Sequence, residues 1–198
     1  MLRFKRKYTD NTDEQLIQLL IAGDSKAFNE LYHRYNQRLL YYFYRMLGNS
    51  NEKAQDFLQD IFIKLIDKAE TFDSSKKFST WIFSIAHNLC KNEYRRMNIR
   101  KTAEIDTFLE VLPDEQETIP EWHRINMDDF ISDLFAELEN FDEIHKTVFL
   151  LRYREEFSVK DISQTLDISE GTVKSRLFYT RKRLSELLSK YQNAFIPD

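Results

Sequence analysis

Apolar residues at helical spacing over the first hundred positions predict four helices. Thr12 and Gln15 form a candidate capping box before a first, short helix, and Gly23 stands where a C-terminal glycine belongs. Asp24 or Ser25 can cap a second, long helix. Its apolar positions recur with a period of about 3.6 residues and are Phe28, Leu31, Tyr32, Tyr35, Leu39, Tyr42, Phe43 and Met46.

Two more helices complete this part of the chain. Ser50 can cap a third helix that ends near Lys68, and Ser79 can cap a fourth over residues 80–97. Four helices, each with an apolar face, can enclose a small core. We therefore expect a first helical domain over residues 1–98.

Between residues 99 and 129 the apolar period disappears. From Lys101 to Asp129 nine acidic residues stand against two basic ones, a net charge of −7, and two prolines interrupt the stretch. Acidic sequence without an apolar period buries too little surface to fold by itself. We expect a flexible acidic linker over residues 99–129.

Helical spacing resumes in the last part of the chain, residues 130–198. Ser158 and Asp161 form a second candidate capping box, the pattern breaks over residues 167–169, and Ser169 can cap a final helix. A short helix, a tight turn and a longer basic helix describe a helix-turn-helix. The apolar positions before this motif are Phe130, Leu134, Leu138, Ile144, Val148, Phe149 and Leu151.

The composition narrows the class of protein. With 3 glycines and 3 prolines in 198 residues, the chain lacks what a turn-rich β fold, a glycine-rich phosphate loop or a dinucleotide fingerprint needs. Cys90 has no partner for a disulfide, and the four histidines show no zinc-ligand spacing. No apolar run approaches the ~20 residues that cross a bilayer, and the first ten residues lack the apolar stretch of a signal peptide. We expect an all-α cytoplasmic protein with no metal, no cofactor and no membrane insertion.

The net charge of −4 hides two basic segments. Residues 76–101 carry seven basic residues against one acidic residue, and residues 170–190 carry six against two. Phosphates respond to the local field rather than to the average charge. One basic segment alone is usually a solvated helix face, but the second coincides with the last helix of the helix-turn-helix. Two basic elements in two domains suggest one DNA duplex held at two places.

At about 100° per residue, the last helix divides into two faces. Val173 and Leu177 point inward, whereas the outward positions are Lys174, Ser175, Phe178 and Tyr179. The second helix of a helix-turn-helix lies in the major groove and presents its N-terminal residues to base edges. Lysine and serine can donate hydrogen bonds to acceptors on nucleobases, and phenylalanine can touch a thymine methyl group. Basic side chains such as Arg181 and Lys182 can neutralise phosphates. The alternative for Phe178 is a partly buried position in the core.

The third helix carries an apolar residue on its polar side. Asp56, Gln59 and Asp60 share one arc, and Ile63 falls among them. The remaining apolar residues lie on the other arc and are Phe57, Leu58, Ile61, Phe62, Leu65 and Ile66. An isoleucine ringed by acidic residues is typical of a docking face, although a solvated face with one stray apolar residue is the alternative.

The motif-like segments of the chain resemble the sigma factors of bacterial RNA polymerase, of the small extracytoplasmic-function type built from regions two and four alone. The segments are Asp56–Leu65, Phe78–Asn88 and Glu170–Leu177, in this order and with the acidic linker between the second and third, and the resemblance runs from Asp13 to Leu188. It implies two small helical domains. The first would dock on core polymerase and melt the −10 element of a promoter, and the second would bind the −35 element as duplex.

The resemblance also implies roles for individual residues. Asp56, Gln59, Asp60 and Ile63 would grip a coiled coil of the largest polymerase subunit. The −35 contacts would be Thr172, Lys174, Ser175, Arg176, Phe178, Tyr179, Arg181 and Lys182. The contacts to the single-stranded −10 element would be Phe72, Lys76, Lys77, Asn88, Lys91, Asn92, Arg95 and Arg96.

The −10 contacts would work by capture of a flipped base. Flipping costs a few kcal/mol, which stacking and hydrogen bonds must offset. Phe72 can stack, and Asn88 and Asn92 lie on one helix face where each can donate and accept. Many relatives carry Asp at the position of Asn92, so the base preference here can differ. Trp81 we interpret as a core residue, since it lies on the apolar side of its helix with Ile82.

The resemblance further implies an inhibitory anti-sigma partner and a linker that threads the polymerase interior. Two other classes of protein are alternatives. A stand-alone regulator that binds an operator as a dimer needs a dimer surface. After Leu184 only Leu187 and Leu188 continue an apolar stripe, which is too short for a leucine zipper. A helical enzyme needs a catalytic or metal-ligand cluster, and the sequence shows none.

Overall fold

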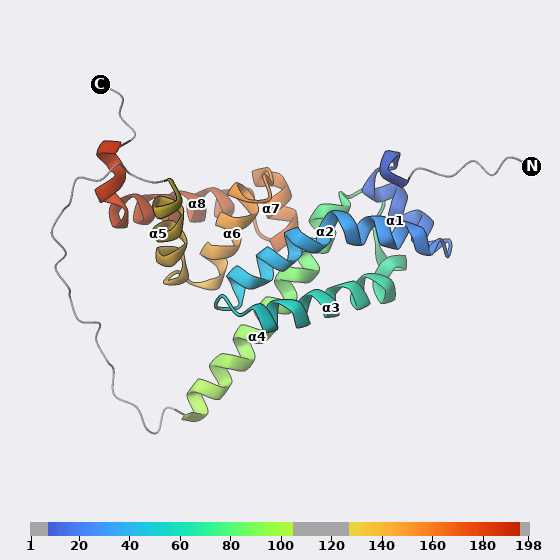
Figure 1. Ribbon diagram of the computed structural model, residues 1–198, viewed down its shortest axis with the longest axis horizontal. Coiled ribbons are helices and arrows are strands. Elements are labelled where there is room, and N and C mark those ends of the chain that lie inside the picture. The colour runs from blue at the N-terminus through green and yellow to red at the C-terminus, as the bar shows by residue number, and fades with distance from the viewer. Residues whose placement is uncertain (1–7, 105–126, 195–198) are drawn as a thin grey trace, which may run out of the picture.

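The computed structural model describes residues 8–104 and 127–194, and every regular element in these ranges is helical (Figure 1). The first part contains α1 (Asp13–Ile21), α2 (Ser25–Met46), α3 (Asn51–Lys68) and α4 (Phe78–Glu104). The second part contains α5 (Met127–Glu139), α6 (Glu143–Tyr153), α7 (Val159–Leu166) and α8 (Glu170–Leu187). Short 3-10 helices are η1 (Tyr8–Asp10), η2 (Ala69–Thr71) and η3 (Ser189–Ala194). The predicted all-α class is confirmed.

Side chains next to the helix ends set most of the boundaries. The capping box of Thr12 and Gln15 is present at α1, and a second box joins Ser158 and Asp161 at α7. Of the two candidates before α2, Asp24 is the cap, because its carboxylate accepts the backbone N–H of Lys26 at 3.1 Å. The caps predicted at α3 and α8 are also present and are Ser50 and Ser169. Each cap satisfies a backbone N–H that the helix itself leaves unpaired.

The start of α4 differs from the prediction. The helix begins at Phe78, so Ser79, the expected cap, lies inside it. The N–H of Phe78 donates instead to the carboxylate of Glu14 on α1, at 2.9 Å. This acceptor is distant in sequence, and no local pattern indicates it.

The end of α4 differs as well. The helix continues past residue 97 and through the boundary expected at 98/99, as far as Glu104. The stretch 98–104 contains no glycine or proline that would stop it. The middle of the predicted linker, residues 105–126, lies outside the described residues.

The first domain is built on the antiparallel pair α2 and α3, with α1 and α4 packed beside it (Figure 1). Arg34 of α2 fixes α1 through an ion pair of 2.8 Å to Asp13, and it also pairs at 2.8 Å with Glu30 of its own helix. Tyr35 donates its hydroxyl to the same Asp13, and burial raises the pKa of this phenol. The fully buried side chains that fill the centre are Leu16, Ile17, Leu31, Leu39, Phe43, Ile61, Leu65 and Phe83.

The second domain consists of α6, α7 and α8 around a small core, with α5 lying across α8. Val148, Ile162 and Val173 are fully buried, one from each of the three helices. In the turn between α7 and α8, Asp167 adopts a left-handed conformation (φ 54°, ψ 50°). Ser163 holds this turn by donating its hydroxyl to the carbonyl of Ile168 at 2.5 Å. The geometry is that of the predicted helix-turn-helix.

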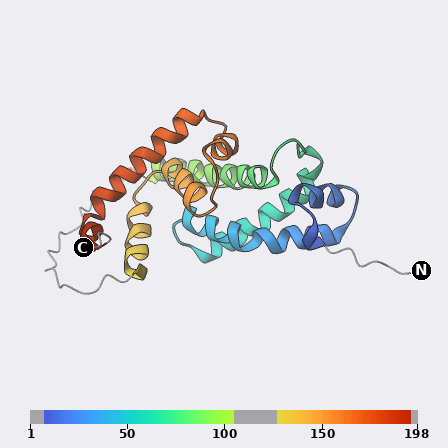
Figure 2. The ribbon, with the colours of Figure 1, turned by 90° about the horizontal axis from the view of Figure 1, so that it is seen from above.

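The two domains pack directly on each other. Helix α7 lies against α4, and α6 lies against α2 and α4 (Figure 2). Phe157, which precedes α7, meets Phe83 of α4 edge to face, with ring centroids 5.5 Å apart. One apolar cluster therefore runs through both domains.

His87 of α4 provides a prediction about stability. Its side chain is 6% exposed, and burial together with the charge of Lys91 lowers its pKa from 6.5 to about 4. The unfolded chain binds a proton at this ring near pH 6.5 and the folded protein only near pH 4, so stability falls between these values as the pH is lowered. The contribution amounts to about 3 kcal/mol at pH 4.

We expect His87→Gln to make stability less dependent on pH. Between pH 7 and pH 4 the unfolding free energy of the wild type should fall by about 3 kcal/mol more than that of the variant. Urea denaturation at a series of pH values measures it. His33→Gln, at an exposed histidine, is the matched control and should track the wild type. Parallel curves for wild type and His87→Gln would contradict the assignment.

Candidate nucleic-acid interface

Helix α8 exposes the face that the sequence predicted. Val173 is fully buried and Leu177 is 8% exposed, so this side faces the core. Lys174 and Ser175 are exposed. Phe178 and Tyr179 are 60% and 62% exposed, and their rings pack edge to face at 5.4 Å. The alternative of a core position for Phe178 is wrong.

The remaining candidates on α8 differ in exposure. Arg181 and Lys182 are exposed, whereas Thr172 and Arg176 are half-buried. The Thr172 hydroxyl lies 2.8 Å from that of the cap Ser169. One terminal nitrogen of Arg176 is buried and finds no hydrogen-bond acceptor among the described residues. Thr172 thus takes part in the cap at the start of the helix. The guanidinium of Arg176 has a hydrogen-bond donor that no described residue uses.

A second polar surface runs along α4. Asn88 and Asn92 lie one turn apart and are exposed, as are Arg95 and Arg96 further along. Lys91 lies between them and is half-buried. Glu93, on the adjoining side of the helix, pairs with Arg96 at 3.3 Å. The surface combines amide groups, which can read base edges, with cations for phosphates.

The loop between η2 and α4 adds two exposed cations, Lys76 and Lys77. Asp73 shapes this loop by accepting hydrogen bonds from the backbone and the hydroxyl of Ser75, which lower the pKa of its carboxyl group. Lys76 and Lys77 immediately precede α4, so their charges adjoin the exposed face of that helix.

Phe72 lies beneath this loop rather than on it. Its side chain is 7% exposed and packs edge to face against Phe78 and Trp81, with ring centroids 6.0 and 5.4 Å apart. Stacking a base on Phe72 would require the ring to leave this cluster. Trp81 is half-buried against the core, in keeping with its interpretation as a core residue.

Helix α3 presents a different kind of surface. Asp56, Gln59 and Asp60 are exposed, and Ile63 is 57% exposed among them. Ile66, expected on the apolar side, is 54% exposed, so that expectation is wrong. The buried arc is narrower than the projection suggests, because only residues facing α2 and α4 are covered. Two isoleucines in acidic surroundings are typical of a protein-binding face.

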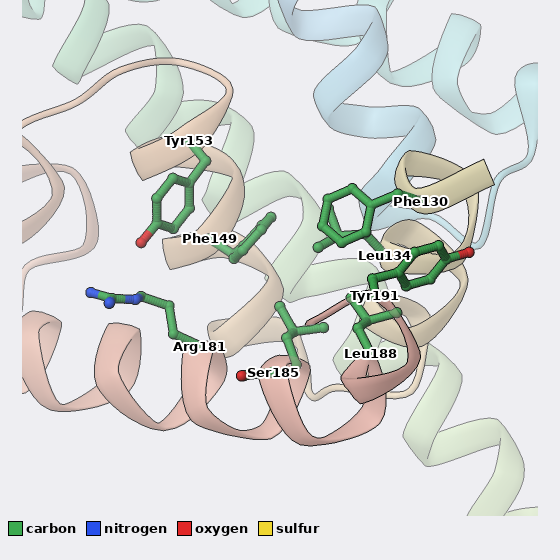
Figure 3. A pocket seen from close by; sticks show the side chains of 9 residues that line it. Phe130, Leu134, Phe149, Tyr153, Arg181, Ser185, Leu188 and Tyr191 are labelled. Carbon is green, nitrogen blue, oxygen red and sulfur yellow. The ribbon is translucent and has the colours of Figure 1, made fainter. Parts of the chain in front are cut away.

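Sequence reasoning missed an apolar groove in the second domain (Figure 3). The groove has a volume of about 370 Å³ and lies between α5, α6, α8 and η3. Its walls include Phe130, Leu134, Phe149 and Leu188, with the guanidinium of Arg181 at its edge. Four elements must assemble before the groove exists, so no single segment of sequence signals it.

Within residues 8–104 and 127–194, no group of three His, Cys, Asp or Glu side chains could hold a metal ion. In the same ranges no helix is sufficiently long and apolar to span a bilayer.

Comparison with known proteins identifies both parts of the chain. Residues 31–99 match the family model of Sigma-70 region 2, and residues 138–184 match that of Sigma-70, region 4. The chain is 29% identical over 180 residues to the ECF RNA polymerase sigma factor SigW of Bacillus subtilis, covering 87% of this chain and 94% of that protein. It is 32% identical over 182 residues to the ECF RNA polymerase sigma-E factor of Haemophilus influenzae, covering 87% and 93%.

Solved structures share the fold. CnrH, in complex with the cytosolic domain of CnrY, superposes with a TM-score of 0.66 at 22% identity and covers 91% of this chain and 99% of its own. The sigma factor RpoE of Bartonella quintana, in complex with the anti-sigma factor NepR, gives a TM-score of 0.64 at 22% identity and covers 83% and 98%.

The exposure of Ile63 on α3 leads to a prediction about stability. Ile63→Ser should change the unfolding free energy by less than about 0.5 kcal/mol, because the side chain already lies in solvent. Ile61→Ser, two residues away at a fully buried position, should destabilise by about 3 kcal/mol or more. Urea denaturation followed by circular dichroism measures both changes. Equal losses for the two variants would show that Ile63 is not a surface residue.

Proposed function

The chain belongs to the extracytoplasmic-function sigma factors, which direct RNA polymerase to promoters, and on this premise we propose which of its surfaces performs each step. As a sigma factor it is a non-enzymatic transcription initiation factor. The family decides against the alternative of a stand-alone dimeric regulator. The observation that carries the proposal is the pair of exposed basic surfaces, on α8 and on α4, that fall in the matched regions 4 and 2.

Helices α5–α8 bind the −35 element as duplex. Lys174 and Ser175 donate to base edges in the major groove, and the exposed ring of Phe178 contacts thymine methyl groups. Tyr179 and the half-buried Thr172 and Arg176 complete the reading face. Arg181 and Lys182, further along the helix, neutralise phosphates.

Helices α1–α4 melt and hold the −10 element. Asn88 and Asn92 hydrogen-bond an unpaired base, and the surrounding cations hold the phosphates of the single strand. These cations are Lys76, Lys77, Lys91, Arg95 and Arg96. Phe72 contributes from below by fixing the loop, since its ring is buried.

The face of α3 made by Asp56, Gln59, Asp60 and Ile63 docks on core polymerase. Exposed acids supply charge complementarity and Ile63 supplies apolar contact. We place the protein in the cytoplasm, where the polymerase acts. We also propose that an anti-sigma factor restrains it, as the complex of RpoE with NepR illustrates for that protein.

Substitutions on α8 test the −35 assignment. Lys174→Ala and Ser175→Ala should each lower transcription from target promoters about 5-fold, the equivalent of ~1 kcal/mol of recognition, and leave binding to core polymerase intact. In vitro transcription by core polymerase with this protein, with start sites mapped, is the measurement. Lys26→Ala, an exposed lysine of the first domain, is the matched control. Wild-type transcription by both variants from every promoter would refute the reading face.

A substitution on α3 tests the docking face. Ile63→Ser should weaken binding to core polymerase about 10-fold, since it removes the exposed apolar contact of a protein interface. Titration of labelled protein with core polymerase measures this affinity. Ile21→Ser, at an isoleucine of α1 that is 37% exposed, is the control and should bind as the wild type does. Equal affinity for the two variants would remove Ile63 from the docking face.

A further inference from the structure

The apolar groove of the second domain has one polar end (Figure 3). The hydroxyl of Tyr153, the last residue of α6, and the guanidinium of Arg181 on α8 both lie at this end. Toward the opposite end the walls are formed by apolar side chains such as Phe130 and Leu188. The lining of the groove therefore changes from hydrogen-bond donors to hydrocarbon along its length.

The two groups at the polar end have donors to spare. Within residues 8–104 and 127–194, neither the Arg181 guanidinium nor the Tyr153 hydroxyl has a hydrogen-bond or ion-pair partner. The Tyr153 ring is 49% exposed and packs on Phe149, with ring centroids 4.7 Å apart, so its hydroxyl is held at the groove rather than free in solvent. A cation beside a phenol is suited to a small anionic group, because hydrogen bonds to a charged acceptor are the strong ones.

The polar groups near the other end are already engaged. The Tyr191 hydroxyl points away from the groove and donates to Asp133 at 2.6 Å. Lys190 pairs with the same carboxylate at 2.6 Å. The Tyr191 ring packs edge to face on Phe130, with centroids 5.2 Å apart. What this end offers to a ligand is therefore apolar surface.

The size of the groove suits a small molecule. Its volume is about 370 Å³, at the lower end of the roughly 300–1,000 Å³ that small-molecule sites occupy. Such sites are mostly apolar, with a few polar groups that fix the orientation of the ligand. A stable contact with another protein needs a much larger surface, ~800 Å² on each partner. Volume and polarity together indicate one short hydrocarbon chain with an anionic head.

We propose that the groove binds an alkyl carboxylate of medium chain length, with the carboxylate on Arg181 and Tyr153 and the chain against Phe130 and Leu188. The apolar end removes the chain from water. The charge of Arg181 selects an acid over an alcohol or an amine. One end of the ligand thus supplies affinity and the other supplies selectivity.

A bound carboxylate competes with DNA. Arg181 is one of the cations that we assign to the phosphates of the −35 element, so this part of the inference rests on the proposed function. One guanidinium cannot hold a ligand carboxylate and a phosphate at the same place. Loss of a phosphate contact weakens binding to all sequences alike and leaves base reading by Lys174 and Ser175 in place. The ligand therefore lowers affinity for DNA without changing sequence preference.

A series of ligands tests the two ends of the groove. Isothermal titration calorimetry of the full chain with hexanoate, octanoate and decanoate should show an affinity that rises about 4-fold for each methylene added, as burial of hydrocarbon requires. Octan-1-ol has the chain without the charge. It should bind about 10-fold more weakly than octanoate, because the hydrogen bonds to a charged group are lost.

Two substitutions locate the site. Arg181→Ala should reduce the affinity for octanoate to that for octan-1-ol and leave the alcohol unaffected. Lys182→Ala removes the same charge from the next position, which is exposed and outside the groove, and should bind both compounds as the wild type does. Ser185→Trp fills the groove from an exposed position on its wall and should abolish binding of both. Glu186→Trp, exposed and outside the groove, is the matched control, and circular dichroism confirms that each variant is folded.

Three results would overturn the site. The first is absence of binding by all three acids. The second is an affinity that does not rise with chain length, or that survives both Arg181→Ala and Ser185→Trp. The third concerns a different occupant: a dimer in sedimentation velocity that Ser185→Trp dissociates would place a second copy of the chain in the groove.

Competition with DNA is measured separately, by fluorescence anisotropy with a labelled DNA duplex. Any sequence serves, since phosphate contacts do not depend on sequence. Decanoate at saturation should weaken binding by the wild type about 5-fold, and Arg181→Ala should show the weaker affinity without decanoate and no further loss with it. Acetate at the same concentration, which lacks the chain, controls for ionic strength.

The outcomes separate the ligand site from the DNA role. Unchanged duplex affinity in Arg181→Ala overturns the phosphate contact in the proposed function and with it the competition, whereas the ligand site stands on the calorimetry. Weaker binding by Arg181→Ala that decanoate fails to reproduce in the wild type overturns the competition alone.

Discussion

The ring of Phe83 is the contact on which the arrangement of the molecule depends. It is fully buried and packs edge to face on Tyr42 of α2 and on Phe157 of the second domain, each with centroids 5.5 Å apart. A single side chain of α4 thus belongs to the core of one domain and to the contact with the other. Edge-to-face aromatic pairs fix both distance and orientation. The polar side of α4 and the acids of α6 and α7 are brought together as a result.

Local chemistry is what the sequence predicted best. Thr12, Ser50 and Ser169 cap their helices because a hydroxyl reaches an N–H within three residues, and such contacts do not depend on the rest of the fold. The start of α4 depends on Glu14, which is 64 residues away. No periodicity or spacing encodes that acceptor, so the nearer Ser79 was the natural but wrong choice.

The candidate site likewise contains residues whose exposure the sequence predicts and others whose exposure it does not. Lys174 and Ser175 lie outside because the buried side of a helix repeats at a fixed angle, and the pattern of α8 is regular. Projection of the sequence on a helix shows which residues share a side, but not how much of that side the neighbouring helices cover. Ile66 projects to the apolar side of α3 and is nevertheless exposed. Projection also fails for Phe72, whose aromatic character suits both a stacking surface and a core, and whose burial depends on Phe78 and Trp81. The groove and the contact between the domains require several segments at once.

Asp161 has two sets of partners, and they lie on opposite sides of a boundary. Its capping hydrogen bonds with Ser158, of 2.7 to 3.2 Å, stay within the second domain, whereas its contacts with Lys77 cross to the first. Loss of the Lys77 contact alone would therefore leave the cap of α7 in place. The fold of α7 and the contact between the domains are thus held by separate hydrogen bonds of one carboxylate.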